Sequence, residues 1–170
     1  MEIKKLTRLS MLLALSVILG LLENMIPFFS GIIPGLKLGL ANIVVLFVLY
    51  TFSSKDAFFL SILRVILMGL ISTGLFSIRF FLSLGGALLS FVVMALSKKY
   101  TKLSVIGTSV LGSIAHSVGQ ILVAILLIKQ GLMIYYLPWL LLFSIPTGIV
   151  VGYMSKYFID YFEKRLKINF

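Results

Sequence analysis

Six long apolar segments, separated by short breaks, constrain this chain more than any other feature. A helix that crosses the ~30 Å hydrocarbon core of a bilayer needs about 20 mostly apolar residues, because each residue adds about 1.5 Å. Charged residues and Gly/Pro breaks delimit six such segments: 7–26, 37–52, 56–72, 79–97, 103–128 and 137–157. The pattern predicts an all-α integral membrane bundle of six transmembrane helices, formed by residues 1–170 as a single domain.

The composition excludes a soluble enzyme and a disordered chain. Hydrophobic residues make up 61% of the sequence and charged residues 12%, whereas soluble domains have about 45–50% and about 25%. The basic N-terminus followed by an apolar run resembles a secretory signal peptide. Neither a small-residue cleavage site nor a polar chain follows it, so we expect 7–26 to be an uncleaved first membrane helix.

The net charge of +10 is also typical of nucleic-acid-binding proteins, so the placement of the charges decides its meaning. In the predicted topology three basic residues lie on one side and Arg64 lies inside the third segment. The other eleven lie on the side of both termini: Lys4, Lys5, Arg8, Lys55, Lys98, Lys99, Lys102, Lys156, Lys164, Arg165 and Lys167. The positive-inside rule then predicts a multi-pass protein of the cell membrane with both termini cytoplasmic. Membrane lipid is the expected partner of these residues, and nucleic acid is not.

Strongly polar residues inside membrane segments are candidates for function, because burying them in lipid is costly. The predicted topology puts them in the outer half of the bundle. They are Glu23, Lys37, Asn42, Arg64, Arg79, His116 and Gln120. This distribution favours a pocket that opens outward over a continuous pore, which needs polar residues along its whole length. Because three cations accompany one carboxylate, we expect the pocket to bind a small anionic or polar-headed molecule.

Structural interpretations of the same residues remain open. Arg64 could form a structural ion pair with Glu23. Lys37 and Arg79 lie near segment ends, where long basic side chains reach the membrane interface. His116 could be a hydrogen-bonded packing residue.

Small residues suggest close helix contacts in two segments. Gly148 and Gly152 form a G-x-x-x-G spacing, and Ser10 and Ala14 have a similar small-residue spacing in the first segment. Such spacings let helices approach closely. They serve either packing within the bundle or docking on a separate membrane partner.

The sequence shows no catalytic, cofactor or metal-binding motif. It has no cysteine, a single histidine, and no Walker A, G-x-S-x-G or H-E-x-x-H pattern. We therefore expect no enzyme activity, no cofactor and no metal site. A transporter built on this chain would need its ATPase in another chain.

Five local stretches resemble the Gx transporter family, also labelled heptaprenyl diphosphate synthase component I. The resemblance extends from about residue 6 to 153, and its most specific part is the Lys37–Asn42 block. The stretches are Pro34–Val44, Leu63–Val65, Ser83–Gly86 with Leu88–Ser90, Ala115–Gln120, and Tyr135–Pro138 leading to Ile145–Gly148. Six short helices, an outward polar pocket and the missing motor also look like the substrate-binding subunit (S component) of an energy-coupling-factor (ECF) transporter.

This resemblance implies a modular importer. An S component captures a small molecule outside, here a vitamin, cofactor, or isoprenoid or quinone precursor. It then docks on a transmembrane coupling subunit that an ATPase pair drives. Ser10 and Ala14 match the usual docking motif, while Ile18 departs from it. The apolar stretch 27–35, bracketed by prolines, is expected to form a re-entrant or lid-like loop.

The second label implies a different function, that of a non-catalytic membrane accessory subunit of a polyprenyl (heptaprenyl) diphosphate synthase. Catalysis by this chain is not expected in that case either. Prenyl synthases hold Mg²⁺-diphosphate through aspartate-rich motifs, because Mg²⁺ needs hard oxygen ligands. The sequence contains no D-D-x-x-D.

Overall fold

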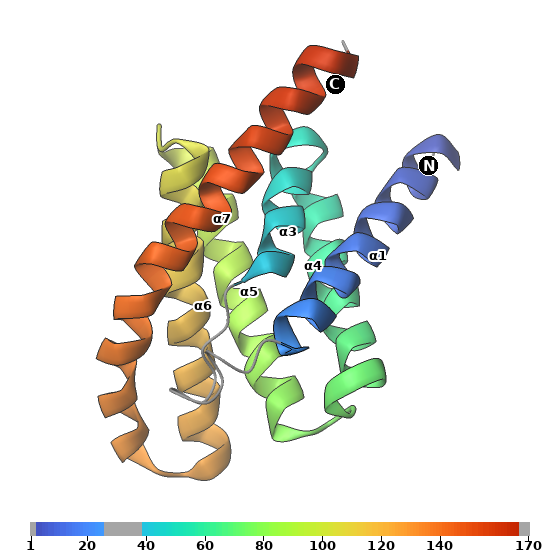
Figure 1. The fold of residues 1–170 in the computed structure, drawn as a ribbon. Coiled ribbons are helices and arrows are strands. Elements are labelled where there is room, and N and C mark those ends of the chain that lie inside the picture. The colour runs from blue at the N-terminus through green and yellow to red at the C-terminus, as the bar shows by residue number, and fades with distance from the viewer. Residues whose placement is uncertain (1–2, 26–38, 167–170) are drawn as a thin grey trace.

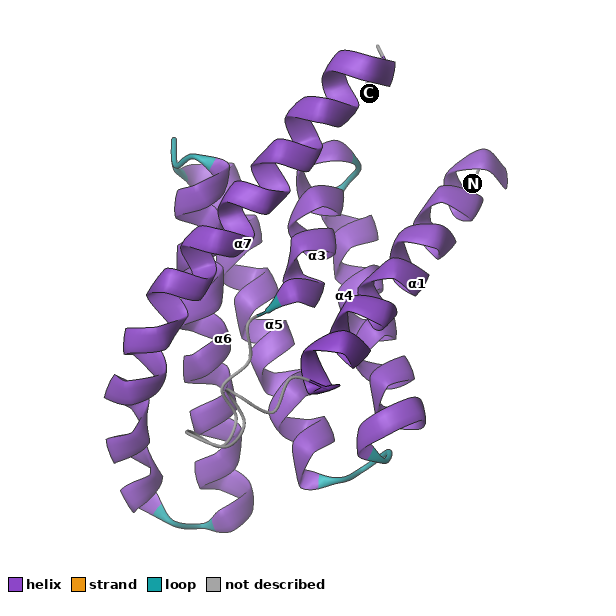
Figure 2. Cartoon of the chain, in the orientation of Figure 1, coloured by secondary structure: helices purple, strands orange, loops and turns teal. Residues whose placement is uncertain are grey.

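The computed structural model describes residues 3–25 and 39–166, and the described chain is almost entirely helical (Figure 2). Its elements are α1 (Ile3–Met25), α3 (Leu40–Thr51), α4 (Ser54–Met68), the π-helical turn η1 (Gly69–Thr73), α5 (Ile78–Tyr100), α6 (Val105–Ile128), the 3-10 turn η2 (Gly131–Tyr136) and α7 (Leu137–Leu166). The prediction of an all-α chain is confirmed, since the described part has no strand. Residue Lys37 and the expected loop 27–35 lie outside the described residues.

Within the described residues, five helical segments are long and apolar enough to cross a membrane, and these indicate a multi-pass membrane protein. They are Ile3–Met25, Ser54–Thr73, Ile78–Tyr100, Val105–Ile128 and Gly131–Lys164. Helix α3 has only 12 residues, or about 18 Å at 1.5 Å per residue. The expectation that its segment also crosses the bilayer is therefore not confirmed by the helix itself.

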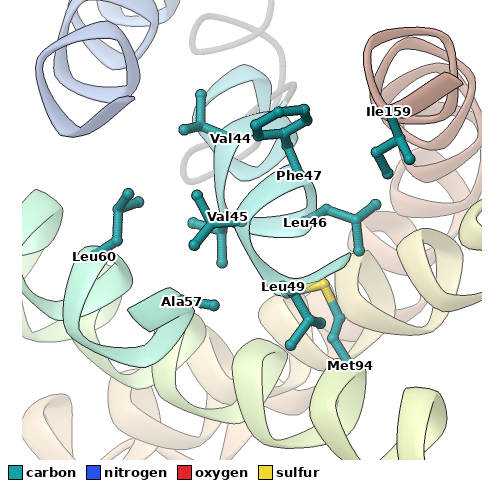
Figure 3. Close-up of a cluster of buried hydrophobic side chains, with 10 residues drawn as sticks. Val44, Val45, Leu46, Phe47, Leu49, Ala57, Leu60, Met94 and Ile159 are labelled. Atoms are coloured by element: carbon teal, nitrogen blue, oxygen red, sulfur yellow. The ribbon is translucent and has the colours of Figure 1, made fainter. Parts of the chain in front are cut away.

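Helix α3 lies at the centre of the bundle, and this position explains its uniformly apolar sequence. Val45, Leu46, Val48 and Leu49 are each at most 1% exposed, and α1, α4 and α7 all pack against the helix. Figure 3 shows its side chains pointing in several directions, towards Leu60 on α4 and Ile159 on α7 among others. Its β-branched residues have only moderate helix propensity, so burial rather than propensity stabilises the helix.

The helices run up and down, and both chain termini lie at the same end of the bundle (Figure 1). From α3 to α7 short turns join successive helices, and three of these helices begin at a serine cap. The hydroxyls of Ser53, Ser77 and Ser104 accept hydrogen bonds from the backbone N–H three residues later, at 3.1–3.2 Å. Each cap satisfies a donor that the helix start would otherwise leave unpaired.

Glycines allow α6 to pack closely against α5 on one side and against α7 on the other. A Cβ on Gly119 of α6 would lie 2.6 Å from the carbonyl oxygen of Gly85 on α5. On α7, a Cβ on Gly148 or Gly152 would lie 2.8 Å from a Cα atom of α6. The G-x-x-x-G pair of α7 is thus buried against α6 and takes part in packing within the chain.

Exposed aromatic residues mark two levels along the bundle. Trp139 lies near the start of α7, at the end away from the termini, and Tyr157 lies near the other end of the same helix; both are exposed. Eighteen positions separate them, which corresponds to about 27 Å along a helix. This spacing is close to the thickness of the hydrocarbon core, at whose two surfaces Trp and Tyr are enriched.

Candidate functional site

A cavity of about 80 Å³ lies among the helices. It is in the half of the bundle away from the chain termini, because its lining residues come from the ends of α1 and α4 and the starts of α3, α5 and α7, together with the middle of α6. Its described lining comprises Gly20, Glu23, Asn24, Gly39, Ala41, Asn42, Arg64, Val65, Met68, Thr73, Phe80, Ser83, Ser113, His116, Ser117, Gln120, Leu140, Ser144 and Thr147. This volume holds several water molecules or part of a small ligand.

The structure brings five of the predicted binding residues together around this cavity. They are Glu23, Asn42, Arg64, His116 and Gln120, and they come from four different helices. Of the other two, Arg79 is exposed near the start of α5 and does not line the cavity, whereas Lys37 lies outside the described residues. The anionic preference inferred from three cations therefore depends, within the described site, on Arg64.

Arg64 lies on α4, and only 8% of its surface is exposed. Its Nη1 donates a hydrogen bond to Oδ1 of Asn42 on α3, at 3.2 Å. The carboxylate of Glu23 also attracts Arg64 electrostatically, and the structural pairing of these two charges considered from the sequence stays a prediction. A guanidinium has five N–H donors, and the described protein supplies an acceptor for one of them.

Glu23 connects the end of α1 to the start of α3. Its Oε1 accepts a hydrogen bond of 2.6 Å from the backbone N–H of Gly39. Gly39 has φ 75°, a conformation that glycine adopts readily, and it immediately precedes α3. A carboxylate is favourable here, because the N-terminal end of a helix carries partial positive charge. At the other end of α3, Nζ of Lys98 donates to the carbonyl oxygen of Leu49 at 2.6 Å.

His116 and Gln120 lie one turn apart on α6 and pack against α5 at a glycine. A Cβ on Gly86 would lie 2.8 Å from Cε1 of His116 and 3.0 Å from Cγ of Gln120. Gln120 is 7% exposed, and the described residues provide no hydrogen-bond partner for its amide. Gly86 thus makes room for the two polar side chains that α6 contributes to the cavity.

The hydroxyls between α6 and α7 mostly satisfy one another. Ser117 and Ser144 share a hydrogen bond of 2.5 Å, and Ser144 is also 2.6 Å from the carbonyl oxygen of Leu140. Thr147 bonds to the backbone of its own helix. These groups form the polar wall without much capacity left for further hydrogen bonds, in contrast to Arg64 and Gln120.

Several lining residues did not appear among the predicted site residues. Ser113 and Ser117 share a helical face with His116 and Gln120, since positions i, i+3, i+4 and i+7 lie on one side of a helix, so this periodicity could have found them. The apolar lining residues Val65, Met68, Phe80 and Leu140 carried no such signal. Apolar side chains occur on every face of a membrane helix.

The described part of the chain contains no group of three His, Cys, Asp or Glu residues that could hold a metal ion. The polar groups of the described lining are a guanidinium, amides, hydroxyls, an imidazole and one carboxylate. Groups of these kinds can interact with a small molecule through hydrogen bonds and charge.

The sequence model described as heptaprenyl diphosphate synthase component I matches residues 12–158. The chain belongs to this family. No curated protein and no solved structure matches the chain. The matched range of this component I chain runs from α1 to α7 and includes every described residue that lines the cavity. The family's name marks it as one component of a system with partner components.

The role of Gly86 in this component I chain can be tested by replacing it with alanine. The new methyl group should displace His116 and Gln120. If a small molecule co-purifies with the chain through this cavity, we expect its binding to weaken by about 10-fold or more, a cost of ~1.4 kcal/mol. The measurement is the amount of small molecule retained per mole of purified protein. Gly107→Ala is the matched control, because its Cβ would meet only ordinary contacts of 3.4 Å or more. Equal retention by both variants would contradict this role.

Proposed function

We propose that this component I chain is the substrate-binding membrane subunit, or S component, of an ECF-type importer. It would capture a small anionic or polar-headed molecule, such as a vitamin, a cofactor, or an isoprenoid or quinone precursor. The observation that supports this most is the convergence of Arg64, Asn42 and Gln120 on one cavity inside an otherwise apolar bundle. Buried polar groups with unused hydrogen-bonding capacity are costly unless a ligand or solvent satisfies them.

The proposed topology has six membrane segments, with α3 as the short second one, and both termini in the cytoplasm at the cell membrane. The eleven basic residues on the side of the termini support this orientation through the positive-inside rule. In this orientation the cavity lies in the outer half of the membrane, where an importer would take up its substrate.

The proposed partners are a transmembrane coupling subunit and an ATPase pair. Ser10 and Ala14 are exposed on α1 and are the proposed docking residues. Gly148 and Gly152, the other predicted docking residues, are buried against α6, so the proposal assigns docking to α1. Large apolar side chains beside the small pair, such as Met11 and Ile18, are also exposed.

A second candidate function is that of a non-catalytic membrane accessory subunit for a polyprenyl diphosphate synthase. The family's description favours it directly. In that role the chain would anchor a soluble prenyl synthase, and its contacts would lie on the outer surface of the bundle. This function gives no task to Arg64 and Gln120, which face the internal cavity.

Co-purification from native membranes distinguishes the two functions. We expect the tagged chain, extracted in mild detergent, to enrich an ATPase pair and a membrane coupling subunit. Ala14→Trp should reduce this enrichment about 10-fold, because the bulky ring prevents close helix approach. Val92→Trp, at an exposed position of α5, is the matched control. Enrichment of a soluble prenyl synthase without any ATPase would overturn the proposal.

A further inference from the structure

Two buried side chains face the cavity with hydrogen-bonding capacity that the described protein does not use. Arg64 has five N–H donors and one bonded acceptor, Asn42. Gln120 is 7% exposed, and the described residues offer its amide no partner. The two side chains lie on different helices, α4 and α6, and line the same cavity. A molecule that occupies this space meets a cationic fork and an amide that can both donate and accept.

The charge of the described lining limits the charge of that molecule. With histidine counted as neutral, the charged residues of this lining are Arg64 and Glu23. Glu23 already accepts the N–H of Gly39 at the start of α3, where the helix end supplies about half a positive charge. Glu23 also attracts Arg64 electrostatically, so the described lining can balance at most one negative charge of a ligand.

A limit of one negative charge favours a carboxylate over a phosphate as the ligand's anionic group. A carboxylate carries one negative charge and accepts two parallel hydrogen bonds from a guanidinium. A phosphate monoester carries about −1.5 to −2 at neutral pH, and a diphosphate carries more. The excess would stay uncompensated in a low-dielectric site, which is costly. The described cavity thus suits a monoanion and disfavours the diphosphate group that the family's name suggests.

The apolar residues of the cavity lining indicate the chemistry of the rest of the ligand. Val65 and Met68 on α4, Phe80 on α5 and Leu140 on α7 line the cavity with apolar surface. These side chains would contact a hydrocarbon or aromatic body attached to the anionic group.

We propose that the cavity recognises a small monocarboxylate with an apolar body, bound through its carboxylate to Arg64, with a second polar group at Gln120. This inference rests on the proposed function, because it specifies the substrate class of the same site. It assigns binding, and no chemical step, to these residues.

A series of probes with one body and different head groups tests the proposal on the purified full chain in detergent. The probes are hexanoate, hexanamide, hexyl phosphate and inorganic pyrophosphate at equal concentration and ionic strength. We expect hexanoate to raise the Tm by about 2–4 °C near saturation for a chain of this length. The other three probes should shift the Tm by less than half as much.

Variants connect the Tm shift to the two residues. Arg64→Gln should abolish the shift by hexanoate, and Arg64→Lys, which keeps the charge but not the fork, should retain part of it. Arg8→Gln, at an exposed position of α1 away from the cavity, should leave the hexanoate shift intact. Gln120→Leu should remove the additional shift that 6-hydroxyhexanoate gives over hexanoate in the unmodified chain. Circular dichroism and the Tm without probe verify that each variant is folded.

Several outcomes would overturn the carboxylate assignment. These are an equal shift by hexanamide, a larger shift by hexyl phosphate or pyrophosphate, an undiminished shift in folded Arg64→Gln, or no shift by hexanoate. Each of them is compatible with co-purification of an ATPase pair, so the S-component proposal would survive it. Conversely, a missing ATPase pair with a specific hexanoate shift would overturn the transporter proposal and leave the carboxylate site.

Discussion

Replacing Arg64 with alanine should reduce the affinity for the captured molecule by about 30-fold or more. Truncating one partner of a buried, hydrogen-bonded charge pair costs about 2–5 kcal/mol, and ~2 kcal/mol already corresponds to this factor. The measurement is mass spectrometry of small molecules released from purified protein, expressed per mole of chain. The variant should still fold, because the losses seen in the described protein are the hydrogen bond to Asn42, worth about 1.5–3 kcal/mol, and the attraction of Glu23.

Arg8→Ala is the matched control for this experiment, since Arg8 is exposed on α1 at the opposite end of the bundle. It should retain as much of the molecule as the unmodified chain. Arg79→Ala tests the remaining predicted arginine, and its exposed position leads us to expect little change. If Arg64→Ala retained the molecule as well as Arg8→Ala does, the binding-subunit proposal would lose its main support and the membrane-anchor function would gain it.

Gly119→Ala should destabilise the bundle more than any other alanine substitution at the tight α5–α6 contact. The added Cβ would lie 2.6 Å from the carbonyl oxygen of Gly85 and 3.1 Å from Cα of Gly86. These are backbone atoms, so the helices themselves must move apart. Overpacking of this kind costs about 1–3 kcal/mol, and Gly119→Leu should cost more. Reversible unfolding in mixed micelles measures the difference in unfolding free energy.

The same substitution should also weaken binding, because Gly119 lies between His116 and Gln120 on α6. Gly131→Ala is the control, since a Cβ at Gly131 would meet nothing within 4 Å; its unfolding free energy should change by less than ~0.5 kcal/mol. A Gly119→Ala protein as stable as the Gly131→Ala protein would show that the α5–α6 contact is looser than the backbone distances require.

Much of the candidate site could be predicted from the sequence for a physical reason. Polar residues are so rare inside apolar membrane segments that each one stands out, and Glu23, Asn42, Arg64, His116 and Gln120 all line the cavity. The interpretation of Arg79 depended on counting charges by side, a method that places a residue along the membrane normal. It carries no information on whether a side chain faces the interior of the bundle or its surface.

The partner of Arg64 was beyond the reach of sequence patterns. Pairing of opposite charges favours Glu23, yet the hydrogen bond goes to Asn42. The reason lies in the backbone: Gly39, with φ 75°, turns its N–H towards Glu23. Once the carboxylate binds the start of α3, Asn42 in the first turn of that helix faces Arg64. The Arg64–Asn42 contact depends on the residue at which α3 begins, and the sequence predicts helix boundaries only approximately.

The sequence by itself determined that the chain is a helical membrane protein. In lipid, every backbone N–H and C=O must be satisfied within the protein, and long apolar segments achieve this only as helices. It also determined the side on which basic residues gather and the few polar residues that enter the bundle. The tertiary structure alone showed that α3 is a short helix enclosed by its neighbours. It also showed which small residues form the α5–α6 contact and which apolar residues line the cavity. The shapes of the facing helices decide these contacts. An apolar side chain is about as stable against lipid as against another helix, so only close packing distinguishes one helix face from another.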